Sequence, residues 1–193
     1  MIVETSEYDT YRIGLCGSYQ LKNIATTLTV LDQLDQLNFD IPKHAIYEGF
    51  EKVREITGFQ GRWQILQDKP KVVADTAHNV GGFQCIVEQL KEQTYKTLRI
   101  VIGVVNDKDI TAILELLPGK AQYYFTQAAI ERALPAEKLM QKGKSFGLNG
   151  QAYQSVEQAI KTVLKEADLS DFVFICGSNF VVGEALPMFS TKE

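Results

Sequence analysis

Hydrophobic and polar positions follow two patterns along the chain, and the change between them falls near residue 58. Before it, hydrophobic residues recur every three to four positions, which predicts a helix over residues 21–34 and a second from Pro42 to Gly58. A strand is expected at Tyr11–Gly17. One strand and two helices do not enclose a core, so residues 1–58 are expected to end a domain whose body lies elsewhere.

From about residue 60, hydrophobic runs typical of strands alternate with helical patterns. The expected strands are Trp63–Leu66, Lys71–Asp75, Leu98–Val104, Gln122–Thr126, Ala152–Ser155 and Asp171–Cys176. Asp109 and Pro135 are expected to begin two of the helices, and Ser155 with Gln158 forms a capping box before a third. This alternation predicts an α/β domain over residues 59–193, with a Rossmann-like, mostly parallel sheet and helices on both faces. Ligands are expected at the carboxyl ends of its strands.

Composition favours a soluble globular protein, with 45% hydrophobic and 23% charged residues. A net charge of -4 without a basic run disfavours nucleic acid and anionic membranes as partners. Cys16, Cys85 and Cys176 lack a CxxC pair, which predicts buried free thiols in a reducing compartment. Since the start lacks a signal-peptide pattern and no hydrophobic run could cross a bilayer, we expect a cytoplasmic protein.

The segment Asp75-Thr76-Ala77-His78-Asn79 carries the strongest candidate chemistry. Asp75 ends a hydrophobic strand and His78 begins the next helix, so both lie where a parallel sheet presents its ligand site. A carboxylate there can accept hydrogen bonds from ribose hydroxyls, and His78 can reach the same cleft. The alternative is that Asp75 only caps the helix and His78 bonds locally. Position alone leaves both interpretations open.

Weaker candidates follow two other strands. Ser178 opens a helix, where backbone N–H groups favour an anion such as a substrate carboxylate, or where the serine only caps the helix. Asp107 and Lys108 either face the ligand cleft or form a solvated turn. Arg132 could pair with a carboxylate or phosphate, or lie on the surface as an ordinary arginine.

Several other chemistries lack support in the sequence. Gly143-Lys144-Ser145 is not a phosphate-binding loop, because Lys138 stands where that loop requires its first glycine. His44 and His78 are the only histidines and no cysteine lies at ligand spacing to either, which argues against a zinc site. A Gly-x-Ser-x-Gly elbow for covalent hydrolysis does not occur.

Three segments, in order, resemble signatures of the folylpolyglutamate and dihydrofolate synthases, which belong to the Mur ligase superfamily. They are Gly17-Ser18-Tyr19-Gln20-Leu21-Lys22-Asn23, Gly61-Arg62-Trp63-Gln64 and Asp75-Thr76-Ala77-His78-Asn79. Arg62 lies thirteen positions before Asp75, a spacing similar to that of the family. Later pieces match in kind, namely Gly103 with Asn106-Asp107-Lys108-Asp109, Arg132-Ala133 and Cys176-Gly177-Ser178. The chain departs from the family at Tyr19, often histidine, and at Gln60 and Val80, often proline.

The resemblance implies the carboxyl-terminal portion of a three-domain ATP-dependent ligase. Residues 1–58 would end its central domain and residues 59–193 would form its Mur ligase C-terminal domain. The resemblance implies that Asn23 contacts the adenine side of ATP, Arg62 the phosphates and Asp75, with His78 nearby, the ribose. Ser178, Asp107 and Lys108 would lie on the glutamate side.

The implied reaction phosphorylates a folate or dihydropteroate carboxylate from ATP with Mg²⁺, and L-glutamate then displaces the phosphate to form an amide. The phosphate loop and the magnesium ligands would lie mainly in a missing amino-terminal part, so this chain alone is expected to be inactive. Two alternatives stay open, a free-standing Rossmann-like nucleotide-binding module and another Mur-type amino acid ligase. The sequence encoded upstream of Met1 would separate them.

Overall fold

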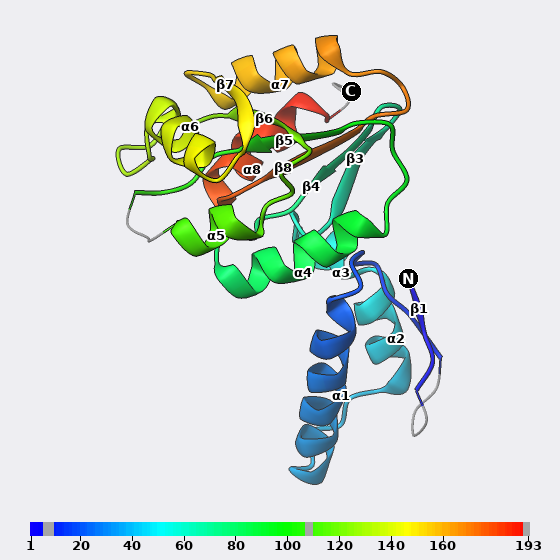
Figure 1. Ribbon diagram of the computed structural model, residues 1–193. Helices are drawn as coiled ribbons and strands as arrows, with labels where there is room; N and C mark the ends of the chain where they lie inside the picture. The colour runs from blue at the N-terminus through cyan, green and yellow to red at the C-terminus, as the bar shows by residue number, and fades with distance from the viewer. Residues whose placement is uncertain (6–9, 107–109, 191–193) are drawn as a thin grey trace. The chain divides into compact units, whose positions relative to one another are not determined.

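The computed structural model describes residues 1–5, 10–106 and 110–190 (Figure 1). It contains two compact units, unit 1 from Met1 to Trp63 and unit 2 from Gln64 to Glu193. The expected helix cap at Asp109 lies outside the described residues. The assignment of residues 1–58 to the end of a central domain stays a prediction.

Unit 1 combines a very short sheet with three helices. Strands β1 (Ile2–Val3) and β2 (Tyr11–Arg12) pair antiparallel. The helices are α1 (Gln20–Gln36), α2 (Lys43–Glu51) and α3 (Val53–Thr57). The second predicted helix is therefore two helices, interrupted at Lys52, and Gly58 ends the last one in the left-handed conformation with φ of 67°.

The strand predicted at Tyr11–Gly17 is wrong beyond Arg12, because the chain leaves β1 and contacts a helix instead. The Gly14 N–H donates to the Phe50 carbonyl in α2 at 2.9 Å. A Cβ at position 14 would collide with the Glu51 carbonyl oxygen, so this close approach requires glycine. The buried core of unit 1 is correspondingly small and consists of Val3, Tyr11, Ile13, Ile24 and Leu28.

Unit 2 is built on a six-stranded sheet in the order β3-β4-β8-β5-β6-β7. Its strands are β3 (Gln64–Asp68), β4 (Lys71–Ala74), β5 (Leu98–Ile102), β6 (Gln122–Phe125), β7 (Asn149–Ala152) and β8 (Phe172–Cys176). Only β3 pairs antiparallel, with β4, and the other neighbouring strands run parallel. The mostly parallel sheet predicted from the alternating pattern is confirmed.

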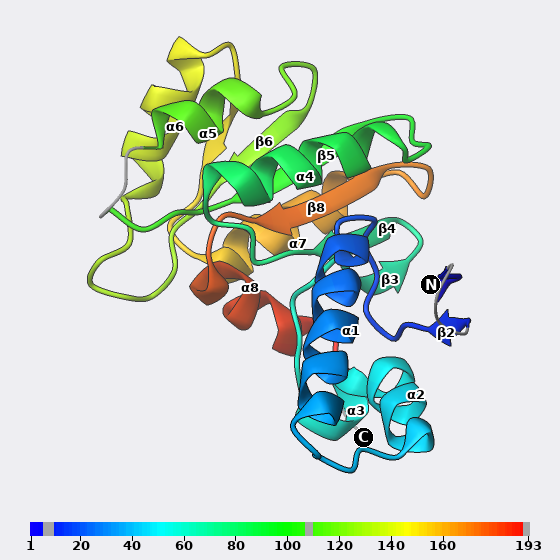
Figure 2. The same cartoon turned by 90° about the horizontal axis from the view of Figure 1, so that it is seen from below.

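Helices cover both faces of this sheet, as Figures 1 and 2 show. Helices α4 (Val80–Lys91), α5 (Thr111–Leu116) and α6 (Ala136–Ser145) lie on one face, and α7 (Val156–Glu166) and α8 (Asn179–Ala185) lie on the other. The 3₁₀ turn η1 (Leu186–Met188) follows α8.

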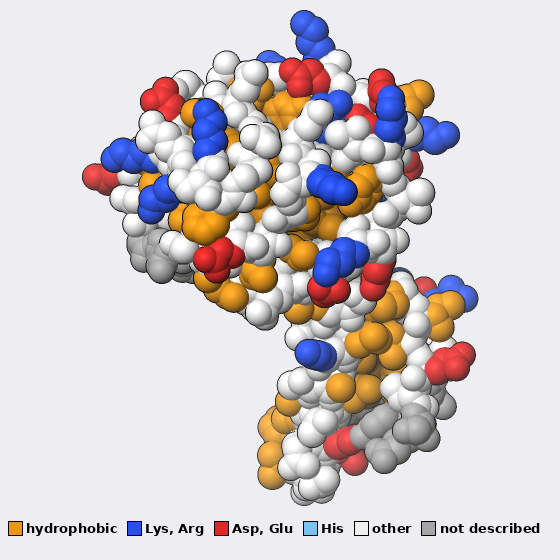
Figure 3. All heavy atoms as spheres, viewed as in Figure 1, with side chains coloured by type: hydrophobic (Ala, Val, Ile, Leu, Met, Phe, Trp, Pro, Cys, Tyr) orange, Lys and Arg blue, Asp and Glu red, His pale blue; other side chains and the backbone are white. Residues whose placement is uncertain are grey.

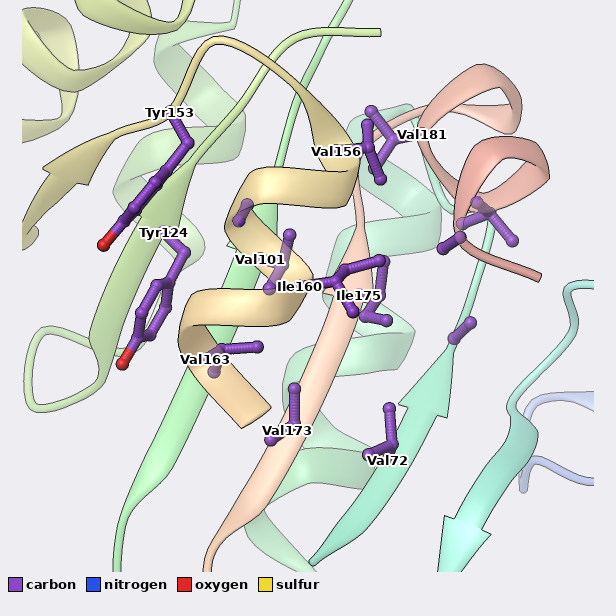
Figure 4. Close-up of a cluster of buried hydrophobic side chains, with 14 of the residues drawn as sticks. Val72, Val101, Tyr124, Tyr153, Val156, Ile160, Val163, Val173, Ile175 and Val181 are labelled. Atoms are coloured by element: carbon purple, nitrogen blue, oxygen red, sulfur yellow. The ribbon is translucent and has the colours of Figure 1, made fainter. Parts of the chain in front are cut away.

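Beneath α7, aliphatic side chains from the helix meet those of the central strands (Figure 4). Ile160 of α7 lies beside Ile175 of β8 and Val156 lies beside Val181 of α8, and Val163 belongs to the same buried cluster. The three α7 side chains are fully buried, and burial of each stabilises the fold by about 2 kcal/mol. The central strands are thereby fixed in position, and the residues at their ends with them.

The strand predicted at Ala152–Ser155 is placed too late, since β7 covers Asn149–Ala152. Gly150 lies so close to Tyr123 of β6 that a Cβ there would collide with the Tyr123 carbonyl oxygen. Ser155 instead caps α7, and its Oγ accepts from the Gln158 N–H at 3.2 Å. Gln158 Oε1 accepts from the Gln154 N–H at 3.1 Å, one residue before the cap, so the predicted pair forms a variant of the capping box.

The three cysteines are free, but only Cys176 is buried and Cys16 and Cys85 are half-buried. The prediction of buried thiols therefore holds for Cys176 alone. Within the described ranges, no helix is both long enough and hydrophobic enough to span a membrane.

Candidate functional site

The first residues beyond four parallel strands lie side by side at one edge of the unit 2 sheet, here called the carboxyl edge. The Asp75 N–H, after β4, donates to the Ile175 carbonyl of β8 at 3.0 Å. The Gly103 N–H, after β5, donates to the Cys176 carbonyl at 3.3 Å, and the Thr126 N–H, after β6, donates to the Ile102 carbonyl at 2.8 Å. The backbone is thus held in register for one residue past the strands.

Two glycines let these strand ends approach closely. Gly177 has a φ of 104°, and a Cβ on it would lie 2.5 Å from the Gly103 carbonyl oxygen. A Cβ on Gly103 would lie 2.6 Å from the Thr126 carbonyl oxygen. Because any larger side chain would force the strand ends apart, these glycines set the positions of the residues that follow them.

Asp75 is a buried carboxylate at this edge, with 3% of its surface exposed. Its Oδ1 accepts from the Ala77 N–H at 2.9 Å. The alternative that Asp75 caps the next helix is wrong, because Asn79 caps α4 by accepting from the Gly82 N–H at 2.8 Å. Burial, and to a smaller extent the charge of Asp75, raises the pKa of the Cys176 thiol well above its usual value. Cys176 is therefore a neutral, buried neighbour of the carboxylate.

His78 and Ser178 both make the local contacts that were considered from the sequence. His78 Nδ1 lies 3.0 Å from the Thr76 carbonyl oxygen, and its side chain is half-buried. Ser178 Oγ accepts from the Val181 N–H at 3.1 Å and caps α8. A serine hydroxyl that accepts one bond can still donate another, so capping leaves Ser178 a donor for a ligand. Asp107 and Lys108 lie outside the described residues.

Asn23 and Arg62 belong to unit 1, whereas Asp75, His78 and Ser178 belong to unit 2. Asn23 lies on α1, is exposed, and donates through Nδ2 to Gln20 Oε1 at 2.7 Å. Arg62 donates to the Gly61 carbonyl at 3.2 Å, and its guanidinium lies 5.3 Å from the centroid of the Phe59 ring. The structure thus brings Asp75, His78 and Ser178 to one edge of the unit 2 sheet. Asn23 and Arg62 are described by their contacts within unit 1.

One feature of the carboxyl edge was missed by sequence reasoning. Thr126 is completely buried, and its Oγ1 has no hydrogen-bond partner among the described residues. Its place directly after β6, equivalent to that of Asp75 after β4, is the signal that could have found it. Arg132, a candidate from the sequence, places its guanidinium 5.1 Å from the centroid of the Phe180 ring at the start of α8.

A polar network lies near the amino ends of β5 and β8, away from the carboxyl edge. Arg99 donates through Nε to Asp171 Oδ2 at 2.8 Å and through Nη1 to the Tyr124 hydroxyl at 2.7 Å. Tyr124 donates to Glu166 Oε2 on α7 at 2.5 Å. Burial disfavours the charge of Asp171, but the hydrogen bond from Arg99 and the further bonds it accepts outweigh burial and lower its pKa. The network ties α7 to the sheet and has a structural role.

The described residues bring no three His, Cys, Asp or Glu side chains together in a group that could hold a metal ion. The groups that the described residues present at the carboxyl edge are a carboxylate, an imidazole and hydroxyl groups, all of which can form hydrogen bonds. Such groups recognise the hydroxyl and carboxylate groups of a polar ligand.

Comparison with known proteins agrees with this geometry. The family described as "Mur ligase, glutamate ligase domain" matches residues 61–179. A probable bifunctional folylpolyglutamate synthase/dihydropteroate synthase of Haloferax volcanii is 31% identical over 90% of this chain and 20% of its own length. The dihydrofolate synthase/folylpolyglutamate synthase of Escherichia coli is 28% identical over 86% of this chain and 38% of its own length. The chain thus spans less than half of these curated relatives.

Solved structures show the same fold. E. coli FolC in complex with DHPP and ADP superposes with a TM-score of 0.70 at 28% identity, over 83% of this chain and 37% of that one. The bifunctional folylpolyglutamate synthase/dihydrofolate synthase of Yersinia pestis gives 0.74 at 25% identity, over 97% of this chain and 43% of that one. The resemblance drawn from the sequence motifs is confirmed. Since the family match covers more than half of the chain, this protein belongs to the Mur ligase family and carries its glutamate ligase domain.

Proposed function

We propose that this chain is the carboxyl-terminal portion of an ATP-dependent ligase that adds L-glutamate to folate or dihydropteroate through an acyl phosphate. The names of its relatives support this function, and so does the ADP and DHPP bound by the similar E. coli protein. The observation that carries the proposal is the buried carboxylate of Asp75 at the carboxyl edge of a Mur ligase domain.

On the nucleotide side, Asp75 is proposed to accept hydrogen bonds from the ribose hydroxyls, with His78 beside it. Burial supports this role for Asp75, because a hydrogen bond from a ligand to a shielded carboxylate is stronger than one made in water. Asn23 is proposed to bond the adenine edge, since an amide both donates and accepts. Arg62 is proposed to contact the phosphates, to which a guanidinium is well matched in charge and geometry.

On the glutamate side, Ser178 is proposed to donate its hydroxyl hydrogen to a substrate carboxylate, and Asp107 and Lys108 are proposed to lie close to it. Ser178 follows β8, the strand next to β4, so it lies at the same edge as Asp75. This order would place the amino acid beside the nucleotide. Such proximity is what attack of the glutamate amine on an acyl phosphate requires.

Magnesium would neutralise phosphate charge in this reaction. Since the described residues gather no group of metal-binding side chains, we propose that its ligands come mainly from the part of the ligase outside this chain. The contribution of this chain is to bind and orient the substrates and to keep water from the acyl phosphate.

The test is Asp75→Asn in the complete ligase that contains this chain. Asparagine keeps an oxygen for the Ala77 N–H, so the fold is retained while the charged acceptor is lost. We expect the KM for ATP to rise about tenfold or more, the equivalent of a charge-assisted hydrogen bond.

The matched control is Asp68→Asn. Asp68 ends β3, which runs antiparallel to β4, so this exposed carboxylate lies at the opposite edge of the sheet. Asp68→Asn should leave the KM for ATP unchanged. An unchanged KM in Asp75→Asn as well would contradict the proposed ribose contact.

A further inference from the structure

The segment that joins β6 to α6, residues 127–134 and here called the β6 loop, is held at both of its ends. Gln127 Oε1 accepts from the Ala136 N–H at 2.9 Å, which ties the start of the loop to the start of α6. The Leu134 N–H donates to the Val104 carbonyl at 2.9 Å, which ties the end of the loop to the segment after β5. The β6 loop is therefore fixed at the carboxyl edge of the sheet.

The β6 loop also contacts the residues that lead to the proposed glutamate side. Val105 and Ala133 form an antiparallel bridge between the segment after β5 and the loop. The Asn106 N–H donates to the Arg132 carbonyl at 2.8 Å. Asn106 directly precedes Asp107, so the loop supports the last described residue before that position.

Helix α8 contacts the β6 loop from the other side. Glu184 Oε1 accepts from the Ala129 N–H at 2.7 Å, and the Arg132 guanidinium lies beside the Phe180 ring. Phe180 and Glu184 are one helical turn apart, so both contacts come from the same face of α8. The helix begins at the Ser178 cap, and its contacts with the loop therefore also bear on the position of Ser178.

The same helix packs directly on the end of β5. A Cβ on Gly103, the first residue after β5, would lie 2.8 Å from Cγ2 of Val181 in α8. The end of β5, the β6 loop and α8 thus each contact the other two. A change in the contact between the loop and α8 would alter how the groups at this part of the edge are placed.

Placement of individual groups matters here because the surface does not gather charge of one sign. On the face of unit 2 that Figure 3 shows, Lys and Arg side chains are interspersed with Asp and Glu side chains. The net charge of the chain is -4. A surface of this kind does not attract an anionic substrate over a distance, so affinity for an acidic amino acid depends on a few well-placed groups.

We propose that Glu184 is a positioning residue for the glutamate side of the site. By holding the Ala129 N–H it fixes the β6 loop against α8, and so fixes Ser178 relative to the segment that leads to Asp107. The inference rests on the proposed function and deepens it, because Glu184 itself is not proposed to touch the substrate.

The test is Glu184→Ala in the complete ligase. The hydrogen bond lies near the surface, so water can bond the Ala129 N–H in its place and the fold is retained. We expect the KM for glutamate to rise about tenfold, because displaced binding groups contact the substrate poorly. Hydrogen exchange of residues 127–134 should become faster in the same variant.

The KM for ATP serves as the internal reference. Asp75 follows β4, which β8 and β5 separate from β6, so the loss of Glu184 should leave this KM unchanged. Glu184→Gln keeps an oxygen for the Ala129 N–H and should bring the KM for glutamate to within about threefold of that of the unsubstituted ligase.

Glu166→Ala is the matched control on the neighbouring helix. Glu166 accepts from the Tyr124 hydroxyl near the amino ends of the strands, away from the carboxyl edge. Its removal takes a carboxylate and a hydrogen bond from α7 and should lower stability, but it should leave the KM for glutamate unchanged.

Four results would overturn the inference. They are an unchanged KM for glutamate in Glu184→Ala, unchanged hydrogen exchange of the β6 loop, an equal rise in the KM for ATP, and a rise in Glu184→Gln or Glu166→Ala as large as in Glu184→Ala. A complete ligase without glutamate-dependent turnover would refute the proposed function. Turnover with an unchanged KM in Glu184→Ala would refute only the role of Glu184.

Discussion

Gly177 is the residue on which the geometry of the carboxyl edge depends most directly. It has a φ of 104° and leaves no room for a Cβ beside the Gly103 carbonyl. Gly177→Ala would combine backbone strain with a collision against backbone. We expect the free energy of unfolding of unit 2 to fall by about 2 kcal/mol or more, measured by urea unfolding.

Gly119→Ala is the matched control, because a Cβ at Gly119 meets nothing within 4 Å and its φ is not in the left-handed region. Its stability should change by less than about 1 kcal/mol. Equal stability of the two variants would show that Gly177 does not hold the strand ends together.

Asp171 gives the stability of unit 2 a dependence on pH. The pKa of Asp171 is lower in the folded state than in the unfolded state, since the bonds it accepts from Arg99 and the backbone outweigh the effect of burial. Its stabilising contribution is therefore complete above the unfolded pKa near pH 4 and is lost as the pH falls through the lower, folded value.

Asp171→Asn should lower the free energy of unfolding by about 3 kcal/mol at pH 7, because Arg99 would keep a buried charge without its partner. The difference from the unsubstituted protein should shrink in urea unfolding at about pH 3. Asp168→Asn removes a carboxylate from an exposed pair with Lys96 and should change the stability far less than Asp171→Asn does. A loss for Asp171→Asn that is the same at both pH values would refute this account.

Part of the candidate site could be predicted residue by residue. Asp75 was identifiable because it ends a hydrophobic run typical of a strand. In a parallel sheet the residue that ends a strand lies at the edge where ligands bind. Sequence reasoning left open whether Asp75 only caps the next helix, and the structure gives the cap of α4 to Asn79. It missed Thr126 because the role of that residue depends on close contact between strands distant in the sequence.

At the scale of elements, α8 is positioned by the cap at Ser178. Ser178→Ala should lower the free energy of unfolding by about 1 kcal/mol through loss of the bond to the Val181 N–H. If Ser178 also contacts glutamate, the KM of the complete ligase for glutamate should rise in the same variant.

Ser155→Ala separates these two effects, because it removes an equivalent cap from α7. It should cost about the same stability and leave the KM for glutamate unchanged. If both variants alter the KM equally, the effect comes from helix stability and Ser178 has no contact with the substrate.

The elements themselves were mostly predictable, because hydrophobic periodicity reports which faces are buried. The two strands that were placed wrongly share one cause. A close backbone approach at Gly14 ends the expected strand early, and another at Gly150 includes that residue in a strand. Both glycines look like ordinary turn residues in the sequence. Such a contact joins segments that are distant in the sequence and requires that a side chain be absent. It therefore does not show in the hydrophobic periodicity from which strands and helices are predicted.

At the scale of the whole molecule, the two units differ in how far each encloses its own core. Unit 2 has a six-stranded sheet covered on both faces, whereas the described core cluster of unit 1 has five buried residues beside an open groove. The chain belongs to the Mur ligase family and spans only part of its curated relatives. Its central role is therefore proposed to be that of one part of a ligase that needs the rest for turnover.

The most direct test of this claim measures glutamate-dependent phosphate release, with ATP, magnesium and dihydropteroate or folate present. The assay compares this chain alone with the complete ligase that contains it. We predict turnover by the complete ligase and none by the chain, because the chain has no phosphate-binding loop of the Gly-x-x-x-x-Gly-Lys-Ser/Thr kind. Turnover by the chain alone at the rate of the complete ligase would contradict the account.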